Sequence, residues 1–75
     1  MDDFTRVAQE TSAALRTLSS AKSDEEADRA RQELEEYCLP ALGQLDSVIA
    51  AASHGLMCDL LRARARRAPV SVAAL

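Results

Sequence analysis

Residues 23–61 read SDEEADRARQELEEYCLPALGQLDSVIAAASHGLMCDLL, and this stretch decides the fold. Apolar side chains recur along it every three or four residues, which is the spacing of one face of an α-helix. The series is Ala27, Ala30, Leu34, Tyr37, Cys38, Ala41, Leu42, Leu45, Val48, Ile49, Ala52, Leu56 and Leu60. The spacing does not change at Pro40, so we predict one long helix over residues 24–38 and 41–66, kinked at that proline.

The start of this long helix is marked by a capping signal. Residues 23–26, SDEE, fit a capping box, in which the Ser23 hydroxyl accepts from a backbone N–H and Glu26 reaches back to the cap. The three acidic residues also lie where the helix dipole favours negative charge. We therefore expect the helix to begin at residue 24.

A first helix should precede it and be much shorter. Asp2 or Asp3 can cap a helix that runs from Phe4 to about Ser20. At 1.5 Å per residue it is about 27 Å long, against about 64 Å for the second helix. Such a helical hairpin leaves the apolar face beyond residue 45 uncovered within the chain, so we expect self-association or a partner to complete the fold. The residues expected to bind that partner are Leu45, Val48, Ile49, Ala52, Leu56, Leu60 and Leu61.

Composition favours an all-α fold in one small domain. The 75 residues include 15 alanines and 10 leucines, which are strong helix formers, and one Phe, one Tyr and no Trp. A core of this size alone rarely gives more than about 3–5 kcal/mol of stability. We expect residues 1–67 to form a single helical domain and the apolar segment 68–75 to be a flexible tail. Two alternative uses of that tail are docking as a strand and recognition through its carboxylate.

Charge is unevenly distributed along the chain. The net charge is −3, yet residues 1–59 hold all 12 acidic side chains, and residues 60–75 hold four arginines and no acid. The acidic balance argues against a general nucleic-acid binder, while the basic end keeps a local patch open. The arginines that could contact phosphates or an acidic protein surface are Arg62, Arg64, Arg66 and Arg67.

The sequence contains no recognisable catalytic set. His54 and Cys58 are four residues apart and are neighbours on one helix face, but no orienting group or oxyanion site accompanies them. We interpret them as a packed thiol beside a surface or interface histidine, and the alternative is a zinc site formed by two such faces in a dimer. The acids of residues 24–36 alternate with Arg29 and Arg31 and should form a solvated face. We predict no enzyme activity, no cofactor and no metal.

The two cysteines and the N-terminal residues bear on the compartment. Cys38 and Cys58 should lie about 30 Å apart on the bent helix, too far for an intrachain disulfide, although an interchain bridge stays open. The start of the chain, Met1-Asp2-Asp3, lacks the basic and apolar regions of a signal peptide. The most apolar stretch, residues 48–61, is too short to span a bilayer. We expect a protein of the reducing cytoplasm.

One segment resembles a known family. Residues 34–39, LEEYCL, resemble the start of the second helix in type III secretion needle subunits, and Gln44 and Val48 fall on matching positions. The resemblance implies a helical hairpin with a polar turn, here residues 19–23. It also implies an assembly subunit of a bacterial secretion system, or one of the small helical co-chaperones that hold such subunits before export. Pro40, the basic end and the apolar tail depart from the family's pattern.

Together these patterns predict a non-catalytic helical module for protein–protein interaction. It would act as an adaptor, a co-chaperone or an assembly subunit, and it would bind itself, as a dimer or higher assembly, or a larger protein. The alternative is a small regulator that contacts nucleic acid through the basic end, residues 62–67. Binding that is strongly weakened by salt would favour the regulator.

Overall fold

A computed structural model describes residues 2–67, and every element in this range is a helix. The order along the chain is α1 (Asp3–Ser20), α2 (Asp24–Glu33), the π-helical turn η1 (Leu34–Cys38), α3 (Leu39–Leu45) and α4 (Ser47–Arg67). The predicted all-α class is confirmed. The apolar segment 68–75, which we predicted to be a flexible tail, lies outside the described residues.

Helix α1 begins and ends close to where the sequence predicts. The Thr5 N–H donates to Oδ1 of Asp2 at 2.6 Å, which makes Asp2 the cap. The helix ends at Ser20. Its buried side chains are spaced three and four residues apart and form one face; they are Val7, Thr11, Ala14 and Leu18.

Helix α2 begins at the predicted capping residue. The Glu26 N–H donates to Oγ of Ser23 at 3.1 Å, and the first turn carries the three acids. Ala27 and Ala30 are the buried residues of α2. Because these side chains are small, as is Ala14 on α1, the two helix backbones can approach closely.

The helix that starts at Asp24 passes through Pro40 and continues to Leu45. Just before the proline, residues 34–38 widen into a π-helical turn, and the Leu39 N–H donates to the carbonyl of Leu34, five residues earlier. Proline has no N–H to donate, and its ring clashes with the carbonyl four residues before it. A wider turn at this point accommodates the proline without ending the helix.

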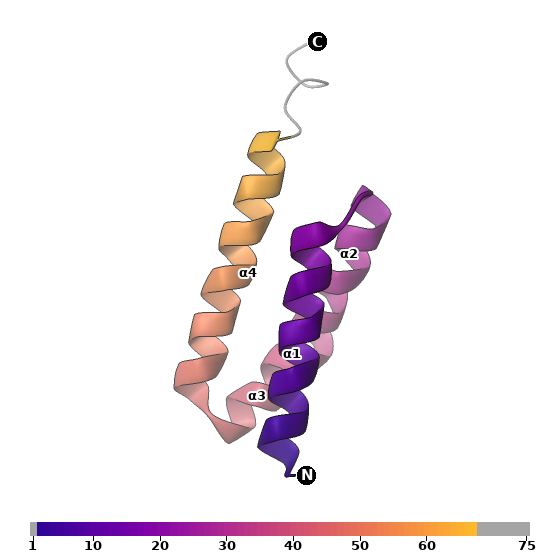
Figure 1. Ribbon diagram of the computed structural model, residues 1–75. Coiled ribbons are helices and arrows are strands. Elements are labelled where there is room, and N and C mark those ends of the chain that lie inside the picture. The colour runs from indigo at the N-terminus through magenta and orange to yellow at the C-terminus, as the bar shows by residue number, and fades with distance from the viewer. Residues whose placement is uncertain (1, 68–75) are drawn as a thin grey trace.

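The chain reverses at Asp46, and here the prediction of a hairpin with a second helix running to residue 66 is wrong. Asp46 has extended backbone angles (φ −156°, ψ 104°). Its Oδ1 accepts from the N–H groups of Val48 and Ile49 at 3.0 and 3.2 Å, so it caps a new helix. Helix α4 then runs beside α1 in the same direction (Figure 1). The bundle thus consists of three helical segments, which are α1, the helix from α2 through α3, and α4. Asp46 thus reverses the direction of the chain at a point where the spacing of apolar residues along the sequence does not change.

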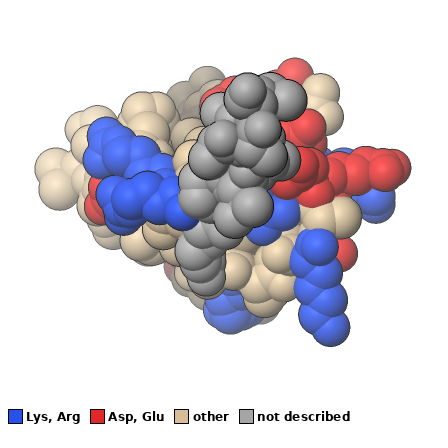
Figure 2. All heavy atoms as spheres, turned by 90° about the horizontal axis from the view of Figure 1, so that it is seen from above, with Lys and Arg blue, Asp and Glu red and all other residues tan. Residues whose placement is uncertain are grey.

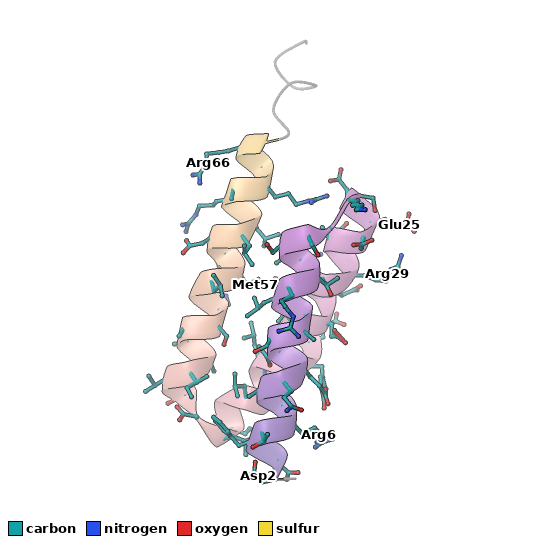
Figure 3. All side chains as sticks on the ribbon, viewed as in Figure 1. Asp2, Arg6, Glu25, Arg29, Met57 and Arg66 are labelled. Carbon is teal, nitrogen blue, oxygen red and sulfur yellow. The ribbon has the colours of Figure 1, made fainter. Side chains whose placement is uncertain are left out.

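The core lies where α1, α2, η1 and α4 meet. Met57 is the contribution of α4 to this core: its side chain is 1% exposed and extends toward α1 (Figure 3). The buried cluster consists of Ala14, Leu18, Ala27, Ala30, Leu34, Cys38 and Met57, with Leu15, Ala21, Leu39, Leu60 and Leu61 partly buried around it. Helix α4 is therefore held in the bundle by one fully buried residue and its partly buried neighbours.

Candidate protein-interaction surface

Exposed apolar side chains gather on the end of α3 and on α4. Among residues 2–67, the large apolar side chains that stay exposed are Tyr37, Leu45, Val48, Ile49 and Leu56. All but the tyrosine come from this part of the chain, and Ala52 between them is exposed as well. We call Leu45, Val48, Ile49, Ala52 and Leu56 the α4 apolar face.

The α4 apolar face is exposed because α4 buries a different side. Leu56 and Met57 are adjacent in sequence and so point in directions about 100° apart on an α-helix. Met57 is directed into the core, whereas Leu56 is 48% exposed and Val48 is 77% exposed. Five of the seven predicted partner-binding residues are therefore exposed, because α4 turns another side to the core and not because part of a hairpin lacks a cover.

Two residues predicted to belong to the partner surface serve the core instead. Leu60 and Leu61 are partly buried and pack against the core cluster. They lie one turn beyond Met57, so they reach the same side of α4 as it does. Less of these two leucines is therefore exposed to a partner than the hairpin implied.

Arg64 has a structural role within the bundle. Its Nη1 donates to the carbonyl oxygen of Ala21 at 3.0 Å, and its Nη2 lies 3.2 Å from Oδ1 of Asp24. Ala21 is the capping residue that follows the end of α1 at Ser20, and its carbonyl has no partner within that helix. Arg64 therefore connects the far end of α4 to the turn between α1 and α2, and a phosphate would compete with these contacts for its guanidinium.

Arg62 and Arg66 differ in their contacts. Arg62 donates to Oδ1 of Asp59 at 3.0 Å, while Arg66 points away from the bundle (Figure 3). In the view along the bundle from this end, basic side chains lie in several separate places among acidic and uncharged residues (Figure 2). The side chain of Arg67 lies outside the described residues.

His54 and Cys58 are neighbours, as their spacing predicts. The Sγ of Cys58 lies 3.9 Å from Nδ1 of His54, on an open part of α4. Within residues 2–67, no third histidine, cysteine or acid joins them in a group that could hold a metal ion.

Cys38 is buried in the core. Burial raises the pKa of its thiol above the ordinary value, and a hydrogen bond with Thr11 opposes that shift. Both cysteines are free thiols. The predicted separation of about 30 Å between Cys38 and Cys58 is wrong. The reversal at Asp46 brings Met57, the residue before Cys58, into the same core cluster as Cys38.

The acidic residues of α2 and η1 form ion pairs on the surface. Arg31 lies 3.0 Å from Glu35 and 3.7 Å from Asp28, and Arg29 lies 4.0 Å from Glu25. All are spaced three or four residues apart along the helix. This arrangement confirms the predicted solvated face.

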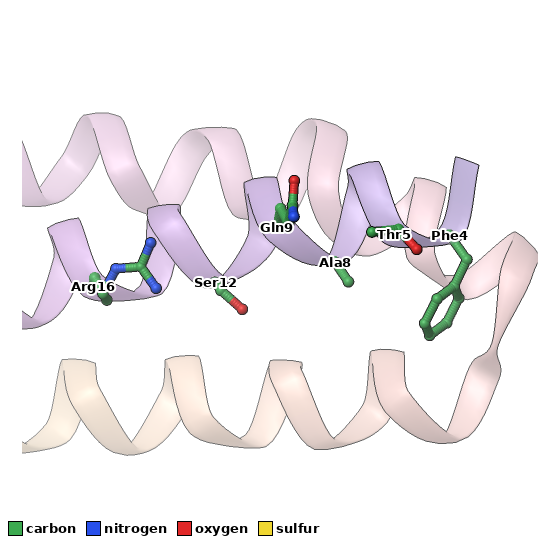
Figure 4. A pocket seen from close by; sticks show the side chains of 6 residues that line it. All are labelled: Phe4, Thr5, Ala8, Gln9, Ser12 and Arg16. Carbon is green, nitrogen blue, oxygen red and sulfur yellow. The ribbon is translucent and has the colours of Figure 1, made fainter. Parts of the chain in front are cut away.

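An open hollow of the surface runs along α1. It is lined by Phe4, Thr5, Ala8, Gln9, Ser12 and Arg16, all from that one helix (Figure 4). It is wide open to solvent and contains a single titratable side chain, Arg16. A hollow of this kind offers no enclosed site for catalysis.

Comparison with protein-family models, with curated proteins and with solved structures found no match. The resemblance of residues 34–39 to needle subunits therefore stays a prediction from those residues. The hairpin that this resemblance implies is replaced by three helices. Within residues 2–67, no helix is both long and apolar enough to cross a membrane.

Proposed function

We propose that the chain is a non-catalytic, helical protein–protein interaction module that binds through the α4 apolar face. The observation that carries the proposal is the division of α4 into two sides. One side is committed to the core through Met57, and another presents Val48, Ile49 and Leu56 to solvent. Contiguous exposed apolar surface on a small protein is typical of a binding site.

The energetics of burial support this use of the face. Fully burying one Val, Leu or Ile side chain is worth about 1.5–3 kcal/mol relative to leaving it exposed. Several such side chains on one rigid helix form the kind of surface that a groove or a second helix can cover. A module that presents such a helix would serve as an adaptor, a co-chaperone or an assembly subunit. The more specific role in a bacterial secretion system rests on the resemblance of residues 34–39 alone.

Contact with nucleic acid through the basic end ranks second. Of the four arginines, Arg64 is engaged with Ala21 and Asp24, and Arg62 is paired with Asp59. Fewer cations are left to neutralise phosphates, and there is no aromatic side chain beside them on α4 for stacking on bases.

Matched substitutions on α4 test the proposed function. Leu56→Asp places a charge on the α4 apolar face, while Ala51→Asp places the same charge at an exposed position off that face. Each tagged variant is used to capture binding proteins from an extract of the source organism at low and at high salt. We expect the unmodified chain and Ala51→Asp to retain the same partner in both, and Leu56→Asp to lose it. Equal capture by all three would contradict the proposal.

A further inference from the structure

We propose that the occupant of the α4 apolar face is α4 of a second copy of this chain, packed antiparallel across a two-fold axis. This inference rests on the proposed function, since it names the partner of the same face. Three features of α4 lead to it: the spacing of apolar residues that are exposed or partly exposed, the alternation of their sizes, and the placement of its charges.

The spacing of residues on α4 is suited to a second helix. Ile49, Ala52, Leu56 and Ala63 follow one another at intervals of three, four and seven residues. This is the repeat that brings two helices together along a narrow seam. Asp59 takes the position in between and is already neutralised by Arg62 at 3.0 Å. The seam does not include Met57, so forming it leaves the core of each copy in place.

The sizes of these residues are self-complementary in one register. When the two-fold axis passes between residues 52 and 56, Ala52 of each copy lies opposite Leu56 of the other. A large side chain then faces a small one twice, which is how facing layers interdigitate. A two-fold interface uses the same patch on both copies, as this arrangement does.

The charges of α4 favour the antiparallel direction. Helix α4 begins after Asp46 and ends in the arginine-rich segment 62–67. In a parallel pair Arg66 of each copy would lie beside Arg66 of the other, and the two charges would repel each other. In an antiparallel pair each basic end lies beside the acidic cap of the other copy, and the two helix dipoles oppose each other favourably. One helix pair buries a modest area, so we expect a dimer with a micromolar dissociation constant.

Sedimentation of matched variants tests whether this face forms the dimer. Ala51 and Ala52 are adjacent, exposed alanines, so an aspartate costs the helix the same at either position. We expect Ala52→Asp to raise the dimer dissociation constant at least about 100-fold, because the change acts twice across the axis, and Ala51→Asp to change it less than about threefold. Equal dissociation by both variants would overturn the assignment of the face.

Cross-linking tests the direction and the register. In a Cys58→Ser background, chains carrying Ala52→Cys are mixed with differently tagged chains carrying Leu56→Cys and oxidised mildly; Cys38 is buried and serves as the unreactive thiol. A disulfide needs Cβ atoms about 3.5–4.5 Å apart, so only residues that face each other are joined. We expect the mixed 52–56 product to exceed either single-type product at least about fivefold. Predominant 52–52 and 56–56 products, or a random mixture, would overturn the antiparallel arrangement.

The outcomes separate this inference from the proposed function. A chain that stays monomeric at high micromolar concentration, yet captures a partner that Leu56→Asp loses, overturns the second copy as occupant and leaves the interaction module standing. A monomer whose capture is indifferent to Leu56→Asp overturns both.

Discussion

The two sides of α4 differ in what they do for the molecule. On the inner side, Met57 fills the core and Arg64 closes the turn between α1 and α2. On the outer side, Val48 and Leu56 contact little of their own chain and remain exposed. An apolar residue on a helix of a small protein can therefore serve either the fold or a partner, and only its direction distinguishes the two. Parallel substitution of an inner residue and an outer residue therefore distinguishes the two roles.

The largest difference is expected between Met57 and Leu56. Met57→Ala removes a fully buried side chain of α4 and should cost about 2–4 kcal/mol, because it leaves a cavity in the core cluster. Leu56→Ala should change the stability of the monomer by less than about 0.5 kcal/mol. Urea unfolding followed by circular dichroism, at a concentration too low for association, measures both. Equal losses would mean that α4 is rotated relative to the arrangement described.

A smaller difference should separate two arginines. Arg64→Gln removes the hydrogen bond to the Ala21 carbonyl and should cost about 1–2 kcal/mol. Asp24 is almost fully exposed, so the ion pair itself adds little. Arg62→Gln breaks only an exposed pair within one helix and should be neutral within about 0.5 kcal/mol. The same unfolding experiment decides, and a neutral Arg64→Gln would show that the far end of α4 is not fastened to the turn.

The stability of the chain should also depend on the Ser23 cap, which lies in the turn between α1 and α2 that Arg64 contacts. Ser23→Ala removes the acceptor for the Glu26 N–H and should cost about 1 kcal/mol. Ser20→Ala is the control, because Oγ of Ser20 only donates to the Arg16 carbonyl in the last turn of α1. We expect the control to be nearly neutral in thermal unfolding. Equal effects of the two changes would indicate that Ser23 does not hold the start of α2.

The smallest expected effect is a gain on the outer side. A Cβ added at Gly55 meets no atom within 4 Å, so Gly55→Ala adds no clash. It removes the conformational freedom of a glycine in the middle of α4 and should stabilise the chain by about 0.5–1 kcal/mol. A rise in the midpoint of thermal unfolding is the expected readout. A fall would show that this side of α4 is covered.

The sequence was sufficient to predict the local signals of the fold. The cap Ser23 was predicted correctly and Asp2 is one of the two caps that were predicted for α1, because capping depends on a side chain and the backbone within three residues of it. The continuation of helix across Pro40 was predicted from the apolar spacing, which reports the buried face on both sides of the proline. These features need no knowledge of distant residues.

The reversal at Asp46 was missed because the apolar spacing carries no direction. The signal that could have found it is short: Asp46 precedes Ser47 and is a residue type that favours helix caps, with Gly43 weakening the helix just before it. Met57 was missed because it does not belong to the series of apolar residues, which places Leu56 and not Met57 on the apolar face of the predicted long helix. Arg64 could not have been separated from the other arginines, since its partner Ala21 lies 43 residues away.

The dependence of binding on salt tests the central claim, the use of the α4 apolar face, most directly. The affinity of the complex that the unmodified chain forms, whether with itself or with a captured protein, is measured over a series of salt concentrations. Contact through apolar side chains predicts an affinity that stays nearly constant or strengthens in sulfate, which favours burial. Contact of the basic end with phosphates predicts a steep fall in affinity, with a slope that grows by about 0.9 for each phosphate neutralised. A nearly flat dependence is the result we predict, and a steep fall that Arg62→Gln and Arg66→Gln together abolish would contradict the account.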